Sequence, residues 1–266
     1  MHHLALTEGI DPWTDPRRVL AEREGWLRSF VAEHAVQTNE VRRSWGLLPA
    51  FLLVASEARR PLDLVELGPS AGLNLLWDRY RYRYDDRSWG PASAQLELDG
   101  ELRRPFPSEL LSVEPEVWRR RGIDLEPVDV TTEEGARLLE CFVWADQRER
   151  LERLRRAIAA LRDEPPELIR GDYVELLPGL LRERSDGALT VVFQTASLGY
   201  LSDDRRAPLF AEIERSGREA PLAFLTSAHD PELDGGWPLE LTVWPGGETR
   251  RLAHQDFHGA WLDWLL

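Results

Sequence analysis

The stretch Leu64-Val65-Glu66-Leu67-Gly68-Pro69-Ser70-Ala71-Gly72 decides the fold. Residues 62–67 form a short apolar run with a carboxylate near its end, which predicts a buried strand that Gly68 closes. A helix is expected to follow over residues 71–84. The small residues of the turn let a ligand approach the backbone, and the start of a helix offers free N–H groups. Ligands of open α/β sheets bind at the carboxyl ends of strands, so this turn is the predicted ligand site.

Strands and helices alternate downstream of this stretch. The pattern predicts strands over 168–170, 189–194 and 222–226, with helices over 174–184 and 203–217. The chain then changes character, because 239–244 and 248–252 flank a Pro-Gly-Gly turn and read as a hairpin. Alternation of this kind indicates an α/β fold with a mostly parallel sheet between helices. The sheet is expected to end in the antiparallel hairpin.

The residues before the deciding stretch read as helices. Asp15 or Thr14 could cap a helix that begins near Pro16, and an apolar helix is expected over 47–58. The chain is therefore divided into an N-terminal helical extension, residues 1–60, and an α/β domain, residues 61–266.

The middle of the chain gives weaker signals. It predicts a strand over 94–98 and a short helix that Gly122 ends. A further helix begins after Thr131 and Thr132 and runs to about Phe142. Residues 146–163 then have the apolar spacing of an amphipathic helix with a charged, solvent-facing side.

Composition excludes several classes of protein. All 33 basic residues are Arg, which rules out a Schiff-base lysine, a pyridoxal-phosphate anchor and a Walker-type lysine. The single cysteine, Cys141, excludes a disulfide framework and a multi-cysteine zinc site. A formal charge of −14 opposes nonspecific binding to nucleic acid or to anionic membranes. The partner expected is a small molecule, and the sequence leaves the oligomeric state open.

The sequence also predicts a cytoplasmic location. Residues 1–10 lack a basic start followed by an apolar run, so no signal peptide is expected. The longest apolar stretch, about 47–55, is far shorter than the roughly 20 residues that a membrane span needs.

The turn also fits a different chemistry. Gly68-x-Ser70-x-Gly72 is the nucleophile-elbow pattern of α/β-hydrolases, and the histidines that could serve it come later in the chain, at His229, His254 and His258. Against this reading, about 60 mainly helical residues precede the turn, and no His-Gly-Gly-type oxyanion segment lies upstream. Glu66 would also have no role in a hydrolase.

Two further chemistries fit the sequence less well. A dinucleotide oxidoreductase would need glycine where Ser70 stands and an acid about 20 residues later, where none occurs before Glu97. His254 and His258 have the i,i+4 spacing of metal ligands, but no third ligand accompanies them. No metal site is therefore expected.

The motif Glu66-x-Gly68-x-Ser70-x-Gly72 resembles the first motif of the Rossmann-like, S-adenosylmethionine-dependent methyltransferases. Three stretches resemble more closely an uncharacterised bacterial family that is known only as a domain of unknown function. They are Gln37-Thr38-Asn39-Glu40-Val41, residues 66–75 with Trp77-Asp78-Arg79-Tyr80, and Val143-Trp144-Ala145-Asp146-Gln147. The last stretch departs from the family pattern at Ala145, where proline is usual. The resemblance runs from about Thr38 to the C-terminus.

The methyltransferase resemblance implies a set of cofactor-binding residues in the turn. Glu66, Gly68, Ser70 and Gly72 would line the methionine and ribose part of S-adenosylmethionine, and Asn74 belongs to the same set. The segment 37–40 is read either as a helix cap or as a lid over the site.

The resemblance also implies residues after the later strands. The acid that binds the ribose would be Asp124 or Asp129, with Glu97 behind them, and this requires an insertion after the first helix. Asp172 would face the adenine amine, although the same residue could cap the following helix. Gln194, Thr195 and Ser197 follow the fourth strand, where the superfamily often places substrate or catalytic groups.

The fold expected is a Rossmann-like methyltransferase fold with an N-terminal helical extension. The function expected is methyl transfer from S-adenosylmethionine to a small-molecule acceptor, with no catalytic residue identified. Because the methyl group is already activated, such enzymes mainly align the acceptor. Two alternatives remain, a cofactor-binding protein without transferase activity and a serine hydrolase that uses Ser70.

Overall fold

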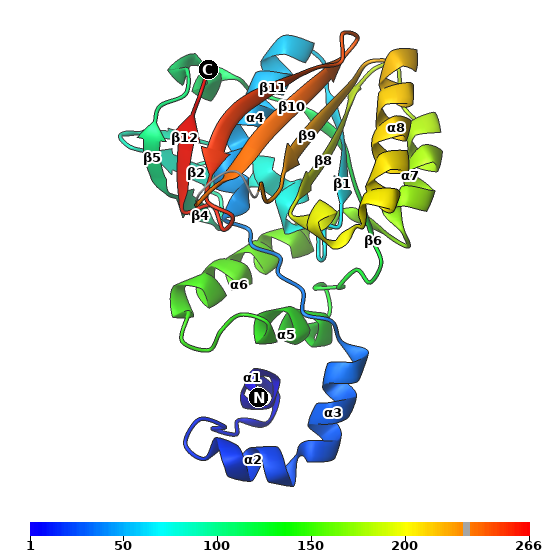
Figure 1. The fold of residues 1–266 in the computed structure, drawn as a ribbon. Helices are drawn as coiled ribbons and strands as arrows, with labels where there is room; N and C mark the ends of the chain where they lie inside the picture. The colour runs from blue at the N-terminus through cyan, green and yellow to red at the C-terminus, as the bar shows by residue number, and fades with distance from the viewer. Residues whose placement is uncertain (231–234) are drawn as a thin grey trace.

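Strand β1 (Leu62–Leu67) lies inside a nine-stranded sheet in the computed structural model, which describes residues 1–230 and 235–266 (Figure 1). The strand order is β5-β12-β11-β10-β9-β8-β1-β6-β7. The other strands are β5 (Glu101–Arg104), β6 (Val117–Asp124), β7 (Glu167–Arg170), β8 (Leu189–Thr195), β9 (Leu222–Ser227), β10 (Trp237–Trp244), β11 (Glu248–Gln255) and β12 (Trp261–Trp264).

The sheet is parallel on one side, and on the other side it is antiparallel except where β5 pairs in parallel with β12. Neighbours in the run β7-β6-β1-β8-β9 pair in parallel. β10 then pairs antiparallel with β9, and β11 antiparallel with β10, which confirms the predicted hairpin. The sheet does not end there, because β12 and β5 extend it beyond β11. The structure is therefore an α/β fold with a large mixed sheet.

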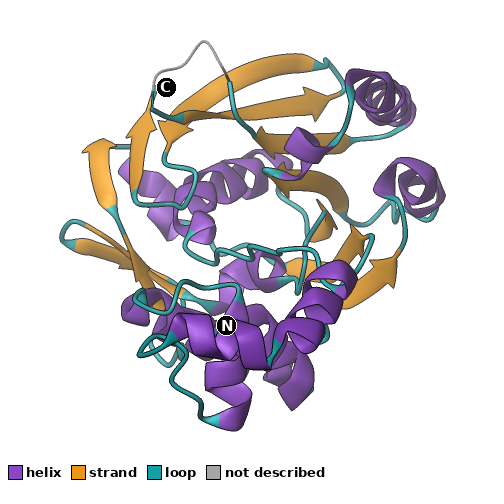
Figure 2. Ribbon diagram, turned by 60° about the horizontal axis from the view of Figure 1, so that its bottom comes forward, coloured by secondary structure: helices purple, strands orange, loops and turns teal. Residues whose placement is uncertain are grey.

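The helices divide into those on the sheet and those outside it. They are α1 (His2–Glu8), α2 (Pro16–Glu22), α3 (Glu24–Glu33), α4 (Arg43–Ala58), α5 (Glu133–Cys141), α6 (Arg148–Asp163), α7 (Tyr173–Arg182) and α8 (Asp203–Glu219). Helices α1–α3 lie away from the sheet, with α1 against α5 (Figures 1 and 2). Asp15 caps α2 as predicted, because its side chain accepts a hydrogen bond from the Arg18 N–H.

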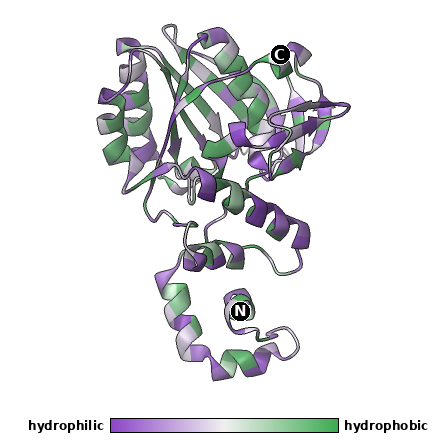
Figure 3. Ribbon diagram, turned by 180° about the vertical axis from the view of Figure 1, so that it is seen from behind, coloured by the Kyte–Doolittle hydropathy of each residue, from purple (hydrophilic) through white to green (hydrophobic). Residues whose placement is uncertain are grey.

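Two apolar cores cover the two faces of the sheet. In β1, Leu62 and Leu64 pack with α4 on one face, while Val65 and Leu67 pack with α7 and α8 on the other. This alternation follows from the period of two residues along a strand. Hydrophobic residues are accordingly concentrated in the central strands and in the helices that cover them (Figure 3).

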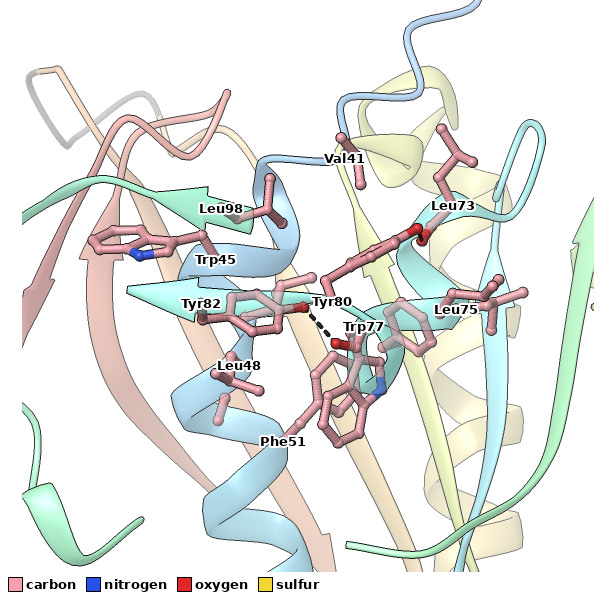
Figure 4. Close-up of a cluster of buried hydrophobic side chains, with 14 of the residues drawn as sticks. Val41, Trp45, Leu48, Phe51, Leu73, Leu75, Trp77, Tyr80, Tyr82 and Leu98 are labelled. Atoms are coloured by element: carbon pink, nitrogen blue, oxygen red, sulfur yellow. Dashed lines mark hydrogen bonds between the residues drawn. The ribbon is translucent and has the colours of Figure 1, made fainter. Parts of the chain in front are cut away.

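Residues 71–84 do not form the predicted helix. A 3₁₀ helix, η1 (Leu73–Arg79), is followed by β2 (Arg81–Tyr84), which pairs with β3 (Arg87–Trp89) and β4 (Glu97–Asp99) in a second, three-stranded sheet. The sequence Arg81-Tyr82-Arg83-Tyr84 buries both tyrosines, which is strand alternation. The Tyr82 hydroxyl donates to the Trp77 carbonyl oxygen at 2.6 Å within the aromatic core (Figure 4).

The predicted short helix that Gly122 ends is also wrong. Residues 117–124 form β6, which lies beside β1. Gly122 is needed inside this strand because a Cβ atom there would lie 2.6 Å from Cγ of Pro69, in the turn after β1. Its role is therefore close packing rather than helix termination. Within the described ranges, no helix has the length and apolar character required to cross a lipid bilayer.

Candidate functional site

A cavity of about 620 Å³ lies at the carboxyl ends of β1, β6, β7 and β8. Its walls come from five segments of the chain that are far apart in sequence. The lining residues are Ala35, Val36, Gln37, Thr38, Asn39, Arg43, Glu66, Gly68, Ser70, Asn74, Asp124, Leu125, Glu126, Asp172, Tyr173, Thr195, Ala196, Ser197, Tyr200 and Leu201. A volume of this size is typical of a small-molecule or cofactor site.

Strand register explains which side chains meet in this cavity. Glu66 follows Leu64 by two residues and therefore points to the face that α4 covers. Glu66 lies opposite Gly122 in β6 and Phe193 in β8, so Asp124 and Thr195, each two residues further on, project to the same face. The predicted site residues Glu66 and Asp124 are thus brought together.

Glu66 is strongly affected by its position in the cavity. Its side chain is 1% exposed, and burial raises its pKa to about 8. The nearby charge of Arg43 and a hydrogen bond from Asn74 oppose that rise, whereas Asp124 adds to it. The Oε2 atom of Glu66 has no hydrogen-bond partner among the described residues. A buried carboxyl group with an oxygen that lacks a hydrogen-bond partner indicates a functional site rather than a purely structural position.

Asn74 is held in place beside Glu66. It lies in η1, is 1% exposed, and its Oδ1 accepts a hydrogen bond of 2.8 Å from the Ser44 hydroxyl of α4. This contact fixes the amide so that its NH₂ group can donate to the carboxyl of Glu66.

The turn after β1 has the left-handed backbone that its small residues permit. Gly68 has φ +71°, and a Cβ atom there would lie 2.6 Å from Cβ of Ser197. Ser70 has φ +56°, and its N–H donates to Oδ2 of Asp124 at 2.8 Å. Gly72, at φ +82°, lies outside the cavity lining and packs against Pro166 instead.

A strap, residues 35–42, crosses the cavity between α3 and α4. Gln37 donates through Nε2 to the Glu126 carbonyl oxygen at 2.7 Å and accepts from the Ser70 hydroxyl at 2.5 Å. Oδ1 of Asn39 accepts from the Leu73 N–H at 3.2 Å. Both side chains thus tie the strap to the turn after β1. The segment also contacts the start of α4: Oε1 of Glu40 accepts a hydrogen bond of 3.1 Å from the N–H of Arg42, the N-cap residue, although the side chain of Arg42 itself provides no cap.

Of three other predicted site residues, one lines the cavity and two do not. Asp172 lines the cavity, and its side chain both caps α7 through the Val174 N–H and pairs with Arg205. Gln194 is fully buried on the opposite face of β8, where its amide donates to Thr226 and Ser227. Asp129 lies outside the cavity and binds the N–H and hydroxyl of Thr131.

Arg43 is the residue that sequence reasoning missed. It is the first residue of α4, is 9% exposed, and lines the cavity near Glu66. The sequence does contain a signal for this residue, namely an arginine at the start of an otherwise apolar helix. A charge at the start of a buried helix must face something polar.

The side chain of Ser70 is engaged with the strap. Its hydroxyl donates to Oε1 of Gln37. Within residues 1–230 and 235–266, no histidine makes a hydrogen bond to Ser70. The same part of the chain contains no cluster of three or more His, Cys, Asp or Glu side chains that could hold a metal ion.

Comparison with known proteins identifies the family of the chain. No curated protein matches the sequence. A model of uncharacterised proteins conserved in bacteria, DUF2332, matches residues 5–264, which covers the α/β sheet, the strap and the cavity. The chain therefore belongs to the DUF2332 family of uncharacterised bacterial proteins.

Proposed function

We propose that the protein binds S-adenosylmethionine in this cavity and transfers its methyl group to a small-molecule acceptor. The observation that carries the proposal is the convergence of Glu66, Asp124 and Asp172 on one cavity. They come from the ends of three neighbouring parallel strands, β1, β6 and β7. Ligands of open α/β sheets bind at this edge.

The residues present are chemically suited to this cofactor. Glu66 has a carboxyl oxygen without a partner, and Gly68 lets the backbone approach a ligand at the methionine end. The two oxygens of Asp124 each accept one backbone N–H, from Ser70 at 2.8 Å and from Glu126 at 3.0 Å. Each oxygen retains capacity for a ribose hydroxyl. Asp172 is proposed to accept from the adenine amine.

Methyl transfer from this cofactor would require little chemistry from the protein's own residues. S-adenosylmethionine, when bound, supplies a methyl group that is already activated on a sulfonium. The protein then has to hold the acceptor in line and exclude water, and a general base is optional. The strap contributes to exclusion of water because Gln37 and Asn39 hold it across the cavity.

Ligand binding tests the proposal directly. Native mass spectrometry and calorimetry with S-adenosylhomocysteine should show one site per chain. Asp124→Asn should weaken binding about tenfold or more, as expected for a lost hydrogen bond to a charged group. Asp129→Asn is the matched control, because Asp129 lies outside the cavity, and it should change affinity by no more than about twofold. An equal loss in both variants, or no binding to the wild-type protein, would contradict the proposal.

A further inference from the structure

Arg43 is a buried cation whose hydrogen-bonding capacity is only partly used. Its Nε donates to the Phe257 carbonyl oxygen at 2.8 Å. Its Nη1 makes long contacts with the carbonyl and hydroxyl oxygens of Thr195, at 3.4 and 3.5 Å. The described residues offer no hydrogen-bond partner for Nη2 and no carboxylate within ion-pair distance of the guanidinium. Burying a charge in this way is costly unless a partner arrives.

Two carboxyl groups attract the charge of Arg43: Glu40, which is already paired with Arg150, and Glu66, which lies on the same cavity wall. Its Oε2 is buried without a partner, and no ion pair joins it to Arg43 in the described part of the chain. The two side chains nevertheless interact at longer range, because the charge of Arg43 lowers the pKa of Glu66. Arg43 and Glu66 thus place a cation and a buried acid on one part of the cavity wall, and the two do not neutralise each other by contact.

We propose that Arg43 and Glu66 together form a receptor for an α-amino-acid group, with Arg43 binding the carboxylate and Glu66 the ammonium. The inference rests on the proposed function and adds that the amino-acid end of the ligand, rather than the nucleoside alone, is selected. A guanidinium matches the geometry of a carboxylate. A zwitterion brings one charge of each sign, so it satisfies both side chains without adding net charge to a buried site.

The protonation state of Glu66 makes ligand binding to this receptor measurable as a release of protons. Burial raises the pKa of Glu66 to about 8, so the free protein holds the acid largely neutral at pH 7. The groups facing it are Arg43 of α4, Asn74 of η1, Asp124 of β6 and the buried Tyr80, whose own raised pKa keeps it neutral. A ligand ammonium favours the ionised carboxylate. Binding at pH 7 should therefore release close to one proton per site.

A series of three ligands separates the two contacts. S-adenosylhomocysteine carries both charged groups, its decarboxylated form keeps only the ammonium, and 5′-methylthioadenosine has neither. Calorimetry with the full chain at pH 7, in two buffers of different ionisation enthalpy, measures affinity and proton release together. Each step of the series should weaken binding at least tenfold. Proton release should accompany the first two ligands and not the third.

Two variants assign the contacts to residues. Arg43→Met should bind S-adenosylhomocysteine and its decarboxylated form with similar affinity, whereas the control Arg250→Met should discriminate as the wild type does. Arg250 is suitable because it pairs with Glu57, outside both the cavity and the strap. Glu66→Gln should abolish proton release. If Arg43→Met fails to fold, the ligand series on the wild-type protein decides the question alone.

The outcomes distinguish this inference from the proposed function. Equal wild-type affinity for S-adenosylhomocysteine and 5′-methylthioadenosine would overturn the amino-acid receptor and leave the cofactor proposal intact. Absence of binding by all three ligands would overturn both.

Discussion

Glu66 is held in a protonation state that is unusual for a glutamate at neutral pH. Its folded-state pKa of about 8 lies above the ordinary value of 4.5, and desolvation is the largest cause. Between these two values the unfolded chain is ionised while the folded chain keeps its proton. The stability contributed by Glu66 is therefore fully present below about pH 4.5 and is lost as the pH rises toward 8.

Glu66→Gln should remove this pH dependence, because glutamine keeps the shape and cannot ionise. The free energy of unfolding of the variant minus that of the wild type should rise by about 1.4 kcal/mol per pH unit within the window. Denaturant unfolding of both proteins at pH 5.5, 6.5 and 7.5 measures this difference. Parallel stability curves would mean that Glu66 ionises normally in the folded protein.

Gly72 and Ser70 should respond to substitution in opposite ways. Gly72→Ala places a Cβ atom 2.8 Å from Cγ of Pro166 at a φ of +82°, so we expect a loss of stability of about 1–3 kcal/mol. Ser70→Ala removes only the contact with Gln37 and keeps the backbone N–H that binds Asp124, so its effect should be mild. Thermal unfolding and S-adenosylhomocysteine titration measure both. A hydrolase activity that Ser70→Ala abolishes would instead favour the nucleophile reading.

The pair Gln194 and Thr195 shows what sequence can and cannot predict at this scale. The end of the fourth parallel strand can be located from its apolar run, which offers Gln194, Thr195 and Ser197 as candidates without separating them. The faces of the strand alternate, so Gln194 points to the α7 and α8 side and Thr195 to the cavity. A strand buried on both faces has no polar alternation, and the sequence therefore cannot show which face is which.

The strap lines the cavity and is attached to the body of the protein at several points. It is held by the three hydrogen bonds of Gln37 and Asn39 to the body of the protein, and Glu40 pairs with Arg150 of α6 at 2.6 Å. Glu40 is 4% exposed, so this ion pair anchors the end of the strap next to α4. The charged face of α6, predicted to be solvent-facing, thus has a structural contact with the strap.

Replacing both Gln37 and Asn39 with alanine should weaken ligand binding while leaving the sheet folded. Each lost hydrogen bond is worth about 1 kcal/mol, so affinity for S-adenosylhomocysteine should fall about tenfold or more. Gln95→Ala is the matched control, because this exposed glutamine makes one side-chain contact, with Asp163, away from the cavity. If the double variant binds normally, the strap has no part in retaining the ligand.

Among the elements, the sequence predicts β1, β7, β8, β9 and α5 to α8, because each is an apolar run or has a clear apolar period, but it does not predict the parallel strand β6. The segments after Gly72 were harder to assign. Residues 73–84 begin with helix-forming residues and then alternate between arginines and buried tyrosines. The helical pattern at the start of this segment therefore favours a helix where β2 forms. β6 contains three consecutive arginines, Arg119 to Arg121, two of which reach the buried Asp63. Only the ion pairs of the folded state make such a strand stable inside a sheet.

The sheet as a whole brings segments that are far apart in the sequence together at one of its edges. The turn after β1, the ends of β6 and β7, and the residues after β8 line one cavity, which the strap crosses. α4 belongs to the core of the sheet and falls within residues 1–60, the stretch predicted as an N-terminal helical extension. The part that lies outside the sheet is α1–α3, which contacts the remainder through α1 and α5 (Figure 1).

The central claim is that this cavity binds an S-adenosyl ligand, and thermal unfolding with S-adenosylhomocysteine tests it most directly. A ligand that binds only the folded state stabilises it by mass action. At a hundredfold excess over the dissociation constant the gain should be about 2.7 kcal/mol, seen as a concentration-dependent rise in melting temperature. An unchanged melting temperature at millimolar S-adenosylhomocysteine would contradict the claim.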